Sequence, residues 1–264
     1  MRIGRDNDGG YVVSRRTIAA ATVVLGLGVN DDWSFERDCT VLNPAIRVVA
    51  VDGSVSASLF RLHALKAAAR AVFAALRLRV GDSAHALRRM VRWLRTARDF
   101  RRFFDGRTRI FHERFFATSE GPAQITWATL KPLLTRDRPG EGPHVFVKMD
   151  IEGAEYRTLQ ALLPDASLIT GMAIEFHDCD LLWERFAELM NALSRDFVVV
   201  HVHGNNCVPL IPGTRCPGAI EISLANRSMV PAQATPRDVR YPLAGLDMPN
   251  LVGHPDYPLV FTDA

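Results

Sequence analysis

Short β-branched apolar runs alternate with helical stretches along most of this chain, and this alternation constrains the fold more than any other feature. Such an alternation is typical of repeated strand–helix units that build a mostly parallel sheet. The sequence therefore predicts an α/β fold with seven strands. The seven apolar runs are residues 21–25, 47–51, 108–111, 144–149, 167–174, 197–202 and 219–224.

The last two runs are joined by a segment rich in Pro and Gly, residues 204–218, and not by a helical pattern. Parallel neighbours need a crossover connection, whereas antiparallel neighbours do not, so we expect the final pair of strands to be antiparallel. Helices are predicted at 154–163, between Gly153 and Pro164, and at 181–193.

An Arg-rich segment, residues 62–104, is too long for a single crossover and predicts two helices broken near Gly81 and Asp82. Residues 61–109 contain fourteen Lys or Arg and three Asp, a local charge of +11 in a chain of formal net charge +3. We expect a basic helical insertion, residues 62–107, within one domain of residues 1–264. Three interpretations stay open: a solvated helix face, a lid over an anionic substrate, or a patch on acidic lipid head groups.

Neither a run of about 18 apolar residues nor an N-terminal signal region is present, which predicts a cytoplasmic protein. Contact between the basic insertion and the anionic inner face of a membrane is a further expectation. The cysteines are too far apart for a zinc knuckle and are interpreted as buried or idle thiols. They are Cys39, Cys179, Cys207 and Cys216.

The first chemical signal is a predicted strand that runs into a GxG turn at Gly26 and Gly28. Glycines at such a turn let backbone N–H groups approach a ligand. The third glycine of a dinucleotide fingerprint is absent, and Asn30 stands in its place. The next predicted strand ends in Asp52, where a carboxylate can accept hydrogen bonds from both ribose hydroxyls. Together these residues predict an adenosine-containing cofactor.

Acidic residues follow the fourth predicted strand, at Asp150 and Glu152. Ligands of open α/β sheets lie beyond the carboxyl ends of strands, so both side chains are expected in the cleft. Acids are also stabilised at a helix N-terminus, which is the alternative interpretation for Glu152 and Glu155. Asp150 is the stronger candidate because it belongs to the strand.

Two further strands end in candidate acid–base groups: Glu175 and His177, then His201 and His203. Alternation places each pair on one face of its strand. A histidine can take a proton from a hydroxyl that is being methylated, so His177 or His203 is the expected base. A divalent metal held by Asp150, Glu175, His177 and His203 is an alternative. The amides of Asn205 and Asn206 are either turn residues or substrate contacts.

Several segments resemble, in order, the FkbM-type S-adenosylmethionine-dependent methyltransferases. The most specific is VKMDIEGAEY, residues 147–156. The others are RIGRDNDGGYVV, GLGVNDDWSFERD, VVAVDGS, ITWATL, IEFHD, HVHGNN and YPLAGLDMPN. The resemblance covers nearly the whole chain apart from residues 63–107.

This resemblance implies a Rossmann-like class I methyltransferase fold, S-adenosylmethionine as cofactor, and O-methylation, frequently of sugar or polyketide hydroxyls. Gly26 and Gly28 match the positions that hold the methionine end of the cofactor, and Asp52 matches the position that holds its ribose. An acid is common near the start of the glycine motif, but Val24 or Leu25 stands there in this chain.

We therefore predict an O-methyltransferase that acts on a hydroxyl of a sugar, glycan or glycolipid-like acceptor, without a nucleic acid partner. The expected cofactor-binding residues are Gly26, Gly28, Asn30, Asp52, Asp150 and Glu152, and the expected acceptor-binding residues are Glu175, His201, Asn205 and Asn206. The alternatives are an NAD-dependent oxidoreductase of Rossmann type and a non-catalytic module that binds anions or membranes. The third glycine and the Tyr-xxx-Lys pair that would support the oxidoreductase are missing from the sequence.

Overall fold

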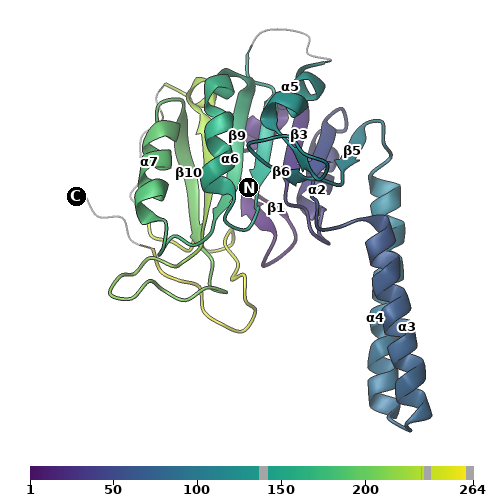
Figure 1. The fold of residues 1–264 in the computed structure, drawn as a ribbon. Helices are drawn as coiled ribbons and strands as arrows, with labels where there is room; N and C mark the ends of the chain where they lie inside the picture. Colours follow the sequence, from purple (N-terminus) through teal and green to yellow (C-terminus); the bar gives the residue numbers. More distant parts are fainter. Residues whose placement is uncertain (137–141, 233, 235–238, 260–264) are drawn as a thin grey trace.

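The computed structural model describes residues 1–136, 142–232, 234 and 239–259. Seven strands form its central sheet. All seven predicted runs become strands of this sheet, with the order β10-β11-β9-β8-β3-β4-β5 (Figure 1). The strands are β3 (Val23–Leu27), β4 (Arg47–Val51), β5 (Arg109–His112), β8 (Val145–Met149), β9 (Ile169–Phe176), β10 (Phe197–Gly204) and β11 (Ile220–Asn226).

The last strand in sequence, β11, runs antiparallel to both of its neighbours, β9 and β10. The pairs β3–β4, β3–β8, β4–β5 and β8–β9 are parallel. This sheet confirms the expected Rossmann-like methyltransferase fold, with its mostly parallel strands and antiparallel last strand. It also places the carboxyl ends of β3, β4, β8 and β9 along one edge.

Helices cover both faces of the sheet, and alternate strand residues face opposite layers. Val23, Leu25 and Leu27 belong to the same apolar cluster as buried residues of α5 (Trp127–Thr135) and α7 (Trp183–Leu193). The opposite face, which includes Val24, packs against α1 (Arg15–Ala20), α2 (Ser34–Leu42) and the small hairpin of β1 (Arg2–Gly4) and β2 (Gly10–Val12). The result is a sheet between two helical layers (Figure 1).

The basic insertion is a helical hairpin of α3 (Ala57–Leu76) and α4 (Val80–Phe103) that projects away from the sheet (Figure 1). Its base is packed on the core through rings that include Trp33, Phe60 and Phe100. The break lies at residues 77–79, where Leu78 has a φ of 55°. The two predicted helices are present, and the break expected near Gly81 and Asp82 lies a few residues earlier. Both residues belong to the first turn of α4, where an acid stabilises the helix N-terminus.

The helix expected over residues 154–163 is also shorter than predicted. It is the four-residue α6 (Glu155–Thr158), followed by the 3-10 segments η1 (Leu159–Ala161) and η2 (Leu163–Leu168). Pro164 lies at the start of η2, where its missing N–H is not needed.

The remaining elements are the two-residue strands β6 (Phe115–Phe116) and β7 (Gln124–Ile125), which pair with each other, and η3 (Arg227–Met229). Within the described part of the chain, we find no helix that is both long and apolar enough to cross a membrane.

Candidate active site

A cavity of about 830 Å³ lies at the carboxyl ends of β3, β4, β8 and β9. The opening hairpin, the turn after β3, the end of β4, the β6 segment, the segment after β8 and the end of β9 all contribute to its lining. Its polar lining includes Arg5, Asp8, Asn30, Asp31, Glu36, Asp52, Ser54, Lys148, Asp150, Glu152, Arg157, Glu175, His177 and Asn205.

The two glycines of the GxG turn have different roles. Gly28 lines the cavity with a φ of 75°, and a Cβ there would collide with the carbonyl oxygen of Asp150. Gly26 lies within β3, and a Cβ at that position would collide with the carboxylate of Glu36 from α2. Gly28 therefore lets the turn approach β8, whereas Gly26 makes room for a buried acid.

Asp52 ties the end of β4 to the glycine turn. Its Oδ2 accepts hydrogen bonds from the N–H groups of Val29 and Asn30, both at 2.8 Å. Its Oδ1 accepts from the N–H and the hydroxyl of Ser54, at 2.7 and 2.6 Å. The carboxylate lines the cavity as expected. Its hydrogen bonds hold the turn after β3 and the segment after β4 in place.

Asp150 follows β8 directly and is held by a buried lysine. The Nζ of Lys148 lies 3.1 Å from Asp150 Oδ2 and donates to the carbonyl oxygen of Gly28 at 2.5 Å. Tyr11, from the opening hairpin, lies with its hydroxyl 3.4 Å from the same Oδ2. Burial alone would lower the pKa of Lys148, but the carboxylates of Asp150 and Glu36 raise it above its usual value. Lys148 thus contributes a buried positive charge to the lining of the cavity.

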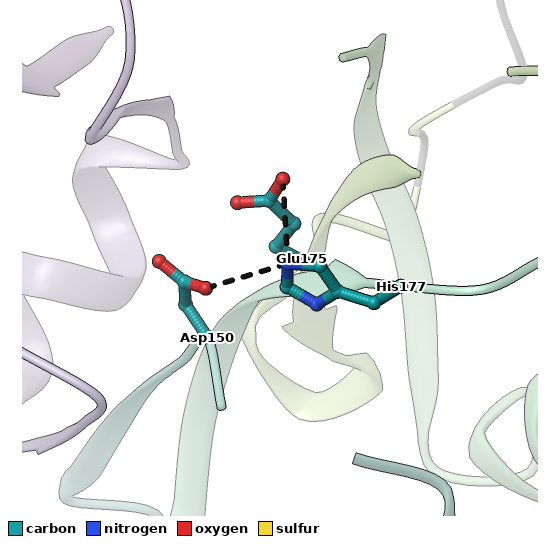
Figure 2. A group of neighbouring side chains, drawn as sticks. All are labelled: Asp150, Glu175 and His177. Carbon is teal, nitrogen blue, oxygen red and sulfur yellow. Dashed lines mark ion pairs between the residues drawn. The ribbon is translucent and has the colours of Figure 1, made fainter. Parts of the chain in front are cut away.

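His177 lies between the carboxylates of Asp150 and Glu175, as Figure 2 shows. Its Nε2 is 3.8 Å from Asp150 and 3.9 Å from Glu175, and the exposed carboxylate of Glu152 is 3.5 Å away. On the other side of the ring, Nδ1 is 3.3 Å from Oε1 of the fully buried Glu155. The structure thus brings together the acids predicted after β8 with the pair predicted at the end of β9.

The negative charge around His177 favours retention of protons in this group. Burial, then the charges of Asp150 and Glu221, raise the pKa of Glu175. Burial alone would lower the pKa of His177, but Glu155 and the neighbouring carboxylates raise it. A cation bound beside these groups would oppose both shifts, because it stabilises their deprotonated forms.

Asp150, Glu175 and His177 also form a group that could hold a metal ion, since one ligand atom from each lies within 4.8 Å of the others. Glu155 would then orient the histidine from behind, as carboxylates commonly do for histidine ligands. His203, the fourth ligand considered from the sequence, is outside this group.

The second histidine pair lies away from the cavity lining. His203 has Nδ1 3.1 Å from Glu221 and Nε2 3.1 Å from Asp256, while His201 has Nε2 2.7 Å from Asp247. Both rings therefore tie the segment after residue 239 to β10 and β11. The structure does not bring His201 or His203 to the predicted base and acceptor positions.

Asn205 and Asn206 lie in different surroundings. Asn205 lines the cavity and donates to Glu175 Oε1 at 2.6 Å. The amide of Asn206 donates to the carbonyl oxygens of Leu251, His254 and Pro255, and so holds the same C-terminal segment as the histidines.

Sequence reasoning did not assign three residues to this site. Glu36 was not considered, because an acid in a helical pattern is ordinarily interpreted as solvated, and Glu155 was interpreted only as an acid at a helix N-terminus. Phe115 is an exposed aromatic residue at the cavity and packs against Gly53, directly after Asp52. The available signals were SFERD, a helix start with an acid on its apolar side, and the paired aromatics at residues 115–116.

Comparison with known proteins gives no family. No protein-family model matches the chain, and no curated protein matches it. The FkbM-type subfamily therefore stays a resemblance.

Among solved structures, the chain is similar to the 23S rRNA methyltransferase ErmE (11% identity, 81% of this chain and 67% of that one, TM-score 0.39). It is similar to an rRNA methylase from Streptococcus thermophilus (11%, 80% and 90%, 0.38). It is also similar to a precorrin-6y C5,15-methyltransferase from Geobacter metallireducens (12%, 80% and 84%, 0.36).

These matches contradict one expectation. We predicted that nucleic acids are not partners, yet ErmE and the Streptococcus thermophilus protein are rRNA methyltransferases. The exclusion of nucleic acid partners is therefore withdrawn.

Proposed function

We propose that this protein is an S-adenosylmethionine-dependent methyltransferase that acts on a hydroxyl oxygen of a polar acceptor, with sugars as the first class to test. The observation that supports this most is the meeting of two groups of residues in one cavity. The turn at Gly28 and Asn30, together with Asp52, is suited to a nucleoside-containing cofactor. Asp150 and His177, which lie 3.8 Å apart, line the same cavity.

The cofactor half of the cavity fits an adenosine. Asp52 would accept the ribose hydroxyls, sharing oxygens that already hold the backbone of Val29 and Asn30. Phe115 would stack on the base, because its ring is half-exposed at the cavity and lies next to the segment that follows Asp52. When bound, S-adenosylmethionine supplies an electrophilic methyl group next to a positive sulfur.

The remaining half of the cavity supplies positioning and one proton acceptor. Asp150, which is held by Lys148, would orient the acceptor, and Glu175 with Asn205 would accept and donate hydrogen bonds to its other hydroxyls. Nε2 of His177 would take the proton of the acceptor hydroxyl as that oxygen receives the methyl group and the carbon–sulfur bond of the cofactor breaks. The positive charge of the cofactor favours the neutral imidazole that this step requires.

A divalent cation is the second candidate for activation of the hydroxyl. Asp150, Glu175 and His177 have suitable ligand atoms, and carboxylate and imidazole donors suit magnesium, manganese or zinc to different degrees. In that case His177 would be a ligand and not the base.

The NAD-dependent alternative is less well supported by the sheet. The dinucleotide-binding order 3-2-1-4-5-6 places the sixth strand beside the fifth. Here the antiparallel β11 separates β9 from β10. The absence of the third glycine agrees with this difference.

Mass spectrometry with methyl-labelled S-adenosylmethionine tests the proposal. The protein would be incubated with a panel of free sugars, glycans and RNA oligonucleotides, and the methylated atom would be identified. We expect label on a hydroxyl oxygen, loss of transfer in His177→Ala, and retention of transfer in the matched control His254→Ala, an exposed histidine outside the cavity.

A chelator distinguishes the base from the metal site. Activity that survives the chelator supports His177 as the base, whereas loss of activity and recovery with a divalent ion supports the metal site. Label on nitrogen or carbon would contradict the proposed chemistry.

A further inference from the structure

Glu36 is a buried acid whose carboxylate has an unused oxygen at the cavity. It lies in the first turn of α2, is only 1% exposed, and belongs to the cavity lining. Its Oε1 has no hydrogen-bond partner in the described structure. The carboxylate rests on Gly26, where any side chain would collide with it.

The cation whose charge acts on this acid, Lys148, already has other partners. Gly26 and Lys148 are register partners on β3 and β8, so Lys148 lies on the strand beside the seat of Glu36. The ammonium of Lys148, however, is directed to Gly28 and Asp150, at 2.5 and 3.1 Å. A buried carboxylate without a full set of partners is costly, and burial raises the pKa of Glu36 to about 7. A ligand that brings an N–H donor with positive charge would remove this cost.

We propose that Glu36 forms a binding subsite for a primary ammonium group, and that its ligand there is the α-ammonium of the amino-acid end of S-adenosylmethionine. The inference rests on the proposed function. Val24 and Leu25 are apolar, so β3 itself provides no acid at the start of the glycine motif. Glu36 of α2 would supply a carboxylate next to this motif instead.

The place of Glu36 in the cavity supports an ammonium ligand over a ribose or a base. The proposed adenosine contacts, Asp52 and Phe115, come from β4 and β6. Glu36 instead comes from α2 and rests on Gly26 of β3, where the charge of Lys148, the register partner of Gly26 on β8, acts on it. The charge of Lys148 acts on Glu36 more strongly than those of Asp32 and Asp150, but the ammonium of Lys148 is shared with Asp150 and Gly28, so an added cation would still stabilise the Glu36 carboxylate.

Calorimetry with two ligands tests this subsite. S-adenosylhomocysteine carries the amino-acid end, whereas 5′-methylthioadenosine has the same nucleoside and a thioether without it. We expect Glu36→Gln to weaken S-adenosylhomocysteine binding at least about tenfold and to leave 5′-methylthioadenosine binding within about twofold of wild type. The matched control is Glu184→Gln, which changes an exposed acid in the first turn of α7 and should alter neither affinity.

A second readout is the proton balance of binding. Near pH 7 the ammonium should displace a proton from Glu36, because it stabilises the carboxylate. Titrations in buffers of different ionisation enthalpy should therefore detect proton release in wild type and less release in Glu36→Gln. The other charged groups facing Glu36 are Lys148, Asp32 and Asp150, and they are unchanged in this comparison.

The outcomes separate the two proposals. Equal weakening of both ligands by Glu36→Gln, or no weakening of either, would overturn the ammonium subsite while cofactor binding stands. If wild type binds neither ligand, the proposed function fails and the subsite fails with it. Thermal unfolding of Glu36→Gln shows whether the variant is folded, and we expect no loss of stability because the change removes a buried charge.

Discussion

Glu155 lies behind His177, with its Oε1 3.3 Å from Nδ1 of the ring, and this contact leaves Nε2 facing the cavity. Glu155 is fully buried and also accepts a hydrogen bond from the N–H of Ile151 at 2.9 Å, so its position is set by the turn after β8. The turn that presents Asp150 therefore also orients the histidine at the end of β9. Glu155 is a positioning residue for His177.

The Glu155–His177 contact predicts a change in titration. Glu155→Gln should lower the pKa of His177 by at least about one unit, because an adjacent carboxylate stabilises the imidazolium. NMR titration of the ring, assigned with His177→Ala, measures this directly. Glu152→Gln, in which the altered side chain is 83% exposed, should have a smaller effect. An unchanged pKa in folded Glu155→Gln would remove Glu155 from this role.

Asp52 predicts a coupled loss of binding and stability. Asp52→Ala should weaken S-adenosylmethionine binding at least about tenfold, because charge-assisted hydrogen bonds to the ribose are lost. It should also lower the free energy of unfolding by about 2 kcal/mol, since the N–H groups of Val29, Asn30 and Ser54 lose their acceptor. Calorimetry and denaturant unfolding measure the two effects. Unchanged affinity in the folded variant would exclude the ribose contact.

Replacement of Phe115 by alanine should weaken the binding of nucleoside ligands without lowering the stability of the fold. Its side chain is 53% exposed, so Phe115→Ala should change the free energy of unfolding by less than about 0.5 kcal/mol. Loss of stacking on a base costs about 1–3 kcal/mol, so S-adenosylhomocysteine and 5′-methylthioadenosine should both bind about tenfold more weakly. Trp183→Ala, at an exposed aromatic residue on α7, is the control. Affinities equal to wild type would show that Phe115 does not contact the base.

The stability difference between wild type and His203→Gln should depend on pH. Burial alone would lower the pKa of His203, but Glu221 and Asp256 raise it to about 9. A histidine with a raised pKa contributes its full stabilisation below its unfolded value of about 6.5 and loses it as the pH rises through about 9. At pH 6, His203→Gln should lower the free energy of unfolding by about 3 kcal/mol, because two buried carboxylates lose their partner.

The difference between wild type and His203→Gln should therefore shrink between pH 6.5 and pH 9 in denaturant unfolding. The exposed His254 provides the control His254→Gln, which should follow wild type across this range. A difference that stays constant with pH would show that the ring of His203 is not the charged partner of Glu221 and Asp256.

Local patterns were enough to predict the sheet and part of the site. Each strand is a short apolar run, and the missing crossover helix before β11 predicted its antiparallel direction. Asp150, Glu175 and His177 meet as expected because β8 and β9 are parallel neighbours whose carboxyl ends share one edge.

The order of strands and the packing of helices were beyond such patterns. His203 was expected at the cleft, but β11 lies between β9 and β10 and places it beside Glu221. Glu36 was missed because its burial depends on the empty space above Gly26, which only the packing of α2 on β3 reveals.

The most direct test of cofactor use is thermal unfolding in the presence of S-adenosylmethionine, S-adenosylhomocysteine or NAD. A ligand at about 100 times its dissociation constant adds about 2.7 kcal/mol to the free energy of unfolding, which corresponds to roughly 5 °C or more in a chain of this size. We predict that both S-adenosyl compounds raise the midpoint, that NAD does not, and that Asp52→Ala reduces the shift to about half or less. Stabilisation by NAD alone, or by none of the three ligands, would contradict the proposed function.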